Sequence, residues 1–151
     1  MFNKIMLWAF LLLPWPTLLF LGKKSVKRYM PVAVFVSLLV TILFEVAHSL
    51  KWWVLIDQIV PWGYITNVSF VYGIFLVGTI WIFHYTYRNF WLYLLVNAVI
   101  DGLFMFVLSN FFEGRIYNLV NFNQFQVFLL MVGLSLVIYG YQKWQEEVFK
   151  W

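Results

Sequence analysis

Five apolar runs alternate with short polar segments along the chain. They cover residues 5–21, 31–50, 68–87, 90–112 and 125–141. A helix that crosses the roughly 30 Å hydrocarbon core of a bilayer needs about 20 apolar residues, and each run approaches or exceeds that length. The pattern predicts an all-α, polytopic membrane helix bundle with about five transmembrane helices, formed by residues 1–151 as a single transmembrane domain.

The segment between the second and third runs, residues 54–66, is moderately apolar but interrupted by Asp57, Pro61 and Gly63. An acidic side chain and helix breakers make continuous insertion into a bilayer costly. We therefore expect a short interfacial segment here that crosses nothing.

Prolines and a polar tail refine the expected helix ends. Pro14 and Pro16 lack backbone donors within the first run, which predicts a kink near Trp15. Pro31 suits the first position of a helix, so we expect the second transmembrane helix to start there. Residues 142–151 are polar enough to form a separate short amphipathic helix at the membrane surface.

Composition supports the membrane interpretation and excludes several other classes of protein. Hydrophobic residues make up 64% of the chain and charged residues 11%, too few to cover a soluble globule. Cysteine is absent, which excludes disulfides, thiolate metal sites and cysteine nucleophiles. The net charge of +4 is small and concentrated near one loop, so we expect the lipid bilayer rather than nucleic acid as the partner.

The basic residues are distributed unequally between the two sides that five membrane crossings define. One side has Lys4, Lys51 and Arg115, and the other has Lys23, Lys24, Lys27, Arg28, Arg88, Lys143 and Lys150. The positive-inside rule then places the N-terminus outside and the C-terminus inside. The cluster at residues 23–28 either sets this topology or binds anionic lipid headgroups.

Polar residues recur at helical spacing within two of the runs. The second contains Thr41 and Glu45 four residues apart, followed by His48, and the fourth contains Asn97 and Asp101 four residues apart. Residues at these spacings share a helix face. At 1.5 Å rise per residue the two acids differ in depth by about 6 Å, so they could form one intramembrane polar site.

Two interpretations of this polar set remain open. It could handle protons or cations, because polar groups inside a membrane are costly and often functional. Alternatively, the groups are neutral and hydrogen-bond neighbouring helices together.

Catalytic and metal-binding motifs have little support in the chain. Glu45 and His48 have the Glu-x-x-His spacing of di-iron bundles, but those proteins use two copies and this chain has one. Motifs for hydrolases, zinc proteases and phosphate-binding loops are absent. We therefore predict no metal, no cofactor and no catalytic residues.

These observations leave two functions. The first is a non-enzymatic accessory or structural membrane component that contacts other membrane proteins or a second copy of itself. The second is a small transporter or binding subunit with a polar site between the second and fourth transmembrane helices.

Several short sequences along residues 5–141 resemble a family of small multi-span membrane proteins from endospore-forming bacilli whose function is uncharacterised. The resembling pieces are Leu13-Pro14-Trp15, Gly22-Lys23-Lys24, Lys27-Arg28-Tyr29, Lys51-Trp52-Trp53, Tyr72-Gly73 with Gly78, Tyr85-Thr86-Tyr87, Tyr93-Leu94-Leu95, and Asn97 with Asp101. The resemblance implies a bacterial cytoplasmic membrane or a spore membrane, and it brings no known activity.

The predicted topology can be tested with single cysteines, because the chain has none of its own. In intact cells, a membrane-impermeant maleimide should label Asn118→Cys and should leave Ser25→Cys and Asn89→Cys unlabelled until the membrane is permeabilised. The reverse pattern would contradict the orientation.

Overall fold

The computed structural model describes residues 2–57, 59 and 67–149, and within them it forms a bundle of helices. Four helices are long and apolar enough to cross a membrane, and a fifth apolar helix is shorter, spanning Phe70–Thr86. The four are Phe2–Phe20, Lys23–Leu50, Phe90–Phe112 and Gln124–Val148. This confirms the predicted all-α bundle and is compatible with an integral membrane protein.

The first helix is broken where its prolines predicted a kink. It consists of α1 (Phe2–Leu12), α2 (Pro14–Thr17) and the 3₁₀ turn η1 (Leu18–Phe20). Proline lacks a backbone N–H, so the regular helical ladder cannot continue through this stretch. The Trp15 indole N–H donates to the Tyr72 carbonyl at 3.1 Å, which ties the broken segment to the centre of the bundle.

The second helix, α3 (Lys23–Leu50), starts eight residues before the predicted start at Pro31. Pro31 lies inside the helix on its exposed face, so the prediction was wrong. Lysine and arginine favour helix, which explains why the basic segment before Pro31 is helical. The 28 residues extend about 42 Å, more than a hydrocarbon core, so the basic first turns would lie beyond it.

The last helix, α7 (Gln124–Phe149), is continuous, which contradicts the predicted end at Tyr141 and the separate tail helix. Gln142 and Gln145 are buried in the bundle, with exposed fractions of 0% and 1%, so this stretch is part of the packed structure. The Arg28 side chain of α3 forms an ion pair with the Glu146 carboxylate of α7. Burial and this pair extend α7 beyond the predicted end.

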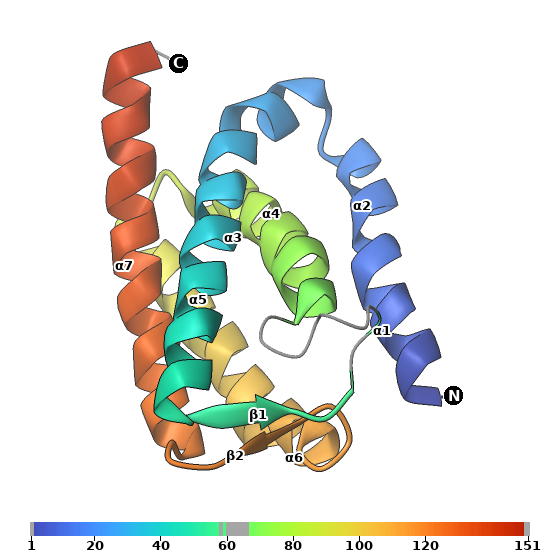
Figure 1. The fold of residues 1–151 in the computed structure, drawn as a ribbon. Helices are drawn as coiled ribbons and strands as arrows, with labels where there is room; N and C mark the ends of the chain where they lie inside the picture. Colours follow the sequence, from blue (N-terminus) through green and yellow to red (C-terminus); the bar gives the residue numbers. More distant parts are fainter. Residues whose placement is uncertain (1, 58, 60–66, 150–151) are drawn as a thin grey trace.

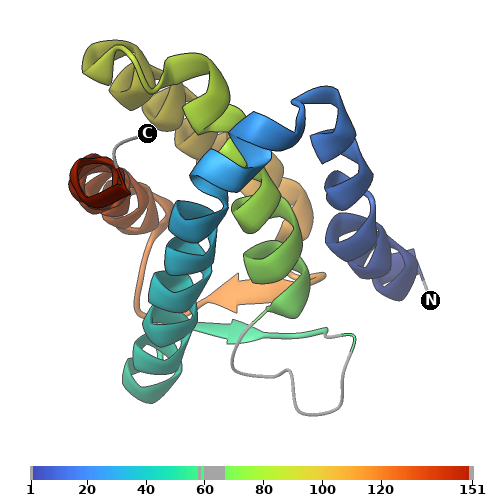
Figure 2. The same cartoon turned by 90° about the horizontal axis from the view of Figure 1, so that it is seen from above.

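The shorter central helix consists of the π-helical segment η2 (Phe70–Phe75) and α4 (Leu76–Thr86). It is followed by α5 (Phe90–Leu103), the π-helical segment η3 (Phe104–Leu108) and α6 (Ser109–Phe112). The Asn89 side chain caps α5 by accepting from the Trp91 and Leu92 N–H groups at 3.0 and 3.3 Å. Figures 1 and 2 show α4 between α3 and the α1–α2 segment.

A two-stranded antiparallel sheet that the sequence did not predict closes one end of the bundle (Figure 1). Strand β1 (Trp53–Leu55) pairs with β2 (Tyr117–Leu119), and Val54 lies opposite Asn118. The start of the expected interfacial segment is therefore a strand. Residues 58 and 60–66 of that segment lie outside the described residues.

Gly73 lets two helices approach to backbone contact. A Cβ atom added there would lie 2.8 Å from the Leu11 Cα and 2.9 Å from the Phe10 carbonyl carbon, and closer still to the Phe10 carbonyl oxygen. The obstructing atoms belong to the backbone of α1, so they cannot move away as a flexible side chain would. Gly78, in the same central helix, has open space around the corresponding position.

We expect Gly73→Ala to destabilise the protein by about 1–3 kcal/mol, because the added methyl would push α1 from η2. Gly78→Ala is the matched control and should be neutral or slightly stabilising, because alanine favours helix more than glycine. Thermal unfolding of both variants in the same detergent would measure the difference. Equal stability of the two variants would contradict the close approach.

Candidate functional site

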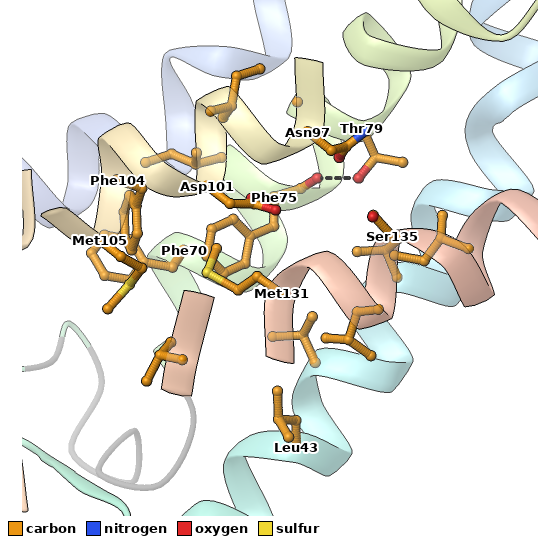
Figure 3. A pocket seen from close by; sticks show the side chains of 18 of the residues that line it. Leu43, Phe70, Phe75, Thr79, Asn97, Asp101, Phe104, Met105, Met131 and Ser135 are labelled. Atoms are coloured by element: carbon orange, nitrogen blue, oxygen red, sulfur yellow. Dashed lines mark hydrogen bonds between the residues drawn. The ribbon is translucent and has the colours of Figure 1, made fainter. Parts of the chain in front are cut away.

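A cavity of about 370 Å³ lies between α3, α4, α5 and α7. Its walls also include residues of η2 and η3, and strands β1 and β2 close it at the sheet end. Figure 3 shows side chains from several of these helices converging on the space. The labelled residues are Leu43, Phe70, Phe75, Thr79, Asn97, Asp101, Phe104, Met105, Met131 and Ser135.

The sheet turns alternate side chains toward the cavity. Trp53 and Leu55 of β1 and Tyr117 and Leu119 of β2 line it, and the register pairs them directly across the two strands. Val54 and Asn118, the intervening pair, are exposed on the other face. Because successive side chains of a strand alternate between its faces, two very short strands provide an apolar floor.

Both π-helical segments contribute to the same cavity. Phe70, Ile74 and Phe75 of η2 and Phe104 and Met105 of η3 line it. A π-helical turn contains an extra residue and thereby rotates the side chains that follow, which is why such turns often occur at functional sites. Here the two segments turn large apolar side chains toward the same space.

Most polar side chains in the cavity wall are already hydrogen-bonded. Thr79 donates to the Phe75 carbonyl at 2.6 Å, and Ser135 donates to the Val132 carbonyl at 2.6 Å. One amide N–H of Asn97 donates to the Tyr93 carbonyl at 2.8 Å, and the amide oxygen can act as an acceptor. Tyr117, at the sheet end, shares a hydrogen bond of 2.7 Å with the Ser109 hydroxyl.

Asp101 differs from these residues because its carboxyl group has no hydrogen-bond partner among the described residues. It is half-buried on α5, one turn after Asn97, and it extends into the cavity in Figure 3. Within the described part of the chain it forms no hydrogen bond or ion pair, and it is the only lining residue with an acidic or basic side chain. A carboxyl group placed among apolar side chains without a partner is costly, so its presence needs an explanation.

The structure separates the five residues that the sequence proposed as a polar site. Asn97 and Asp101 line the cavity together, whereas Thr41, Glu45 and His48 do not. Thr41 shares a hydrogen bond of 2.9 Å with the Tyr72 hydroxyl, and so joins α3 to η2. Glu45 and His48 are exposed near the end of α3, so Glu45 and Asp101 do not share one site.

The basic residues proposed to bind lipid headgroups occupy the opposite end of the bundle from the sheet. Lys23, Lys24 and Lys27 are exposed in the first turns of α3, where a headgroup could reach them. Arg28 instead pairs with Glu146, and its guanidinium lies 5.2 Å from the centre of the Tyr87 ring. The charge of Arg28 is therefore balanced by Glu146 within the bundle. Headgroup binding by the three lysines stays a prediction.

The sequence did not single out Thr79, Ser135 or Met131 as lining residues. Isolated hydroxyls and methionines inside apolar runs are common in helix bundles, and the helical period alone does not distinguish a tight interface from a cavity. Among the described residues, no group of three or more His, Asp or Glu side chains could hold a metal ion.

No protein-family model matches this chain, and neither a curated protein nor a solved structure was found to be significantly similar to it.

We expect Asp101→Leu to stabilise the protein by about 1–3 kcal/mol, because it removes a polar group without a partner from apolar surroundings. Ser37→Ala should have the opposite effect and cost about 1 kcal/mol, because the Ser37 hydroxyl donates to the Val71 carbonyl of the central helix at 3.2 Å. Unfolding both variants in matched lipid–detergent mixtures would compare them. A destabilised Asp101→Leu would show that the carboxyl joins helices.

Proposed function

We propose that this chain is a multi-pass membrane protein whose central cavity binds a small, largely apolar molecule. The observation that supports this most strongly is the cavity itself. Its volume of about 370 Å³ lies within the range of about 300–1,000 Å³ of small-molecule sites. Its wall combines apolar and aromatic side chains with a few converging polar groups, which is the usual composition of such sites.

The contents of the wall argue against a simple packing defect. Interiors of folded proteins are close-packed, and an empty space of this size loses the dispersion contacts that a filled core would make. Large side chains surround the cavity, including Phe44, Trp53 and Trp81, so residues that could fill it are held in its wall. The unpaired carboxyl of Asp101 would add a further cost that a structural role does not require.

This proposal takes up the second function expected from the sequence, in a modified form. The proposed site has walls from α3 and α5, and its polar part is formed by Asn97 and Asp101, without Thr41, Glu45 and His48. An accessory role through helix contacts stays a prediction, because it requires no cavity and nothing in the described residues favours it.

We further propose the orientation with the basic end inside. The start of α3, the α4–α5 turn and the end of α7 lie at one end of the bundle, opposite the sheet (Figure 1). This end has Lys23, Lys24, Lys27, Arg28, Arg88 and Lys143. We propose a bacterial cytoplasmic or spore membrane as the location, with the lipid bilayer as surroundings, and the family resemblance supports this proposal.

Filling the cavity tests the proposed binding function. The wild-type protein in phosphatidylcholine nanodiscs should bind tritiated 1-neopentylnaphthalene, a neutral apolar probe, saturably and at about one molecule per chain above empty nanodiscs. Gly78→Leu should abolish this binding, because Gly78 lines the cavity and a side chain added there enters open space.

Gly133→Leu is the matched control. Gly133 also has open space at its Cβ position, but it lies on the exposed face of α7 and is absent from the cavity wall. It should bind the probe like the wild type. Absence of saturable binding to the wild type, or full binding by a folded Gly78→Leu, would contradict the proposed function.

A further inference from the structure

We infer that the ligand of the cavity is a lipophilic monocation, an amine or quaternary ammonium compound whose charged group lies against Asp101. The inference rests on the proposed binding function and adds the chemical class of the ligand. It follows from the charge, the hydrogen-bonding character and the aromatic content of the wall.

The charge of the wall is one-sided. Among the described lining residues, Asp101 is the only one with an acidic or basic side chain, and no Lys, Arg or His faces the cavity. Arg28, a partly buried basic residue of α3, is paired with Glu146 and does not line the cavity. An ionised Asp101 therefore has no counter-charge in the described part of the protein, and a bound cation would provide it.

Acceptor oxygens lie close to Asp101 in the cavity wall. One amide N–H of Asn97 donates to the Tyr93 carbonyl, and the amide oxygen is an acceptor one helical turn from Asp101, on the same face of α5. The hydroxyls of Thr79 and Ser135 have already donated to carbonyls of their own helices. A positively charged ligand that donates hydrogen bonds would meet these oxygens and the Asp101 carboxyl group, whereas an anion would be repelled by an ionised Asp101.

The rest of the wall favours an organic cation over a metal ion. Calcium takes six to eight oxygen ligands and magnesium six, far more than Asp101 and Asn97 provide. Aromatic rings from several elements surround the space instead, including Phe75, Trp81 and Phe104. Ring faces attract cations, and the same rings bury the apolar body of a ligand.

A pair of probes that differ in charge and share one shape tests this inference. The cation is (1-naphthylmethyl)trimethylammonium, and its neutral isostere is 1-neopentylnaphthalene, in which carbon replaces the nitrogen. Both are measured as tritiated compounds in nanodiscs of phosphatidylcholine, a lipid without net charge, with binding to empty nanodiscs subtracted. The wild type should bind the cation at least about tenfold more tightly than the neutral probe.

Replacing the carboxyl should remove this preference. Asp101→Asn should weaken binding of the cation at least about tenfold and should change the affinity for the neutral probe far less. Glu45→Gln is the matched control, because it also converts an acid to its amide, at an exposed position of α3 outside the cavity wall. It should bind both probes like the wild type.

The remaining outcomes distinguish failure of the cationic-ligand inference from failure of the binding function. If the neutral probe binds the wild type saturably but the cation binds no better, the inference of a cationic ligand is wrong and the binding function stands. If neither probe binds saturably, both proposals fail. Should Asp101→Asn not fold, the wild type and Asp101→Glu, which keeps the negative charge, still test the inference. Both should bind the cation more tightly than the neutral probe. If the wild type shows no such preference, the inference is overturned.

Discussion

A peptide group that lies in hydrocarbon without a hydrogen-bond partner costs several kcal/mol, and in the membrane setting proposed here this constraint determines where each kind of backbone can lie. The long apolar runs satisfy it within themselves by forming helices. The two short strands pair with each other at one end of the bundle, where their outer edges can meet water or headgroups. Both kinds of structure line the cavity: helices form its sides, and the two-stranded sheet closes it at one end.

Helix positions could be predicted wherever bilayer thickness alone decides them. The segment Phe90–Phe112 has the expected bounds, because an apolar run of 23 residues between polar segments forms a helix long enough to cross the hydrocarbon core. Helix ends that depend on neighbouring elements could not be predicted in this way. Pro31 suits a helix start, but the helix formers before it extend α3, and Gln142 looked like a surface residue until the packing of α7 buried it. The sheet was missed because its strands are three residues long and lie far apart in the sequence.

The candidate site shows the same limit at the level of side chains. Glu45 and Asp101 have equivalent polar spacing in the sequence, each four residues after another polar residue of an apolar run. Periodicity predicts that such residues share a helix face, but it does not say what that face contacts. Tertiary packing turns Asp101 into the cavity and leaves Glu45 exposed near the end of α3. Of the five predicted residues, Asn97 and Asp101 line the cavity, Glu45 and His48 belong to the exposed end of α3, and Thr41 joins α3 to η2.

Another acidic side chain of the bundle, Glu146, does have ion-pair and hydrogen-bond partners. Glu146 has Arg28 as its partner across two helices, and the Gln142 amide donates to the same carboxylate at 3.1 Å. Ten basic residues are available, yet the described structure brings none of them to the cavity wall. A binding site needs polar groups that are held in place but unsatisfied until the ligand arrives, and such groups reduce the stability of the empty protein. Glu146 at the basic end has several partners, whereas Asp101 beside the cavity has none among the described residues. This difference is what we expect if the cavity binds a positively charged, largely apolar molecule, as proposed above.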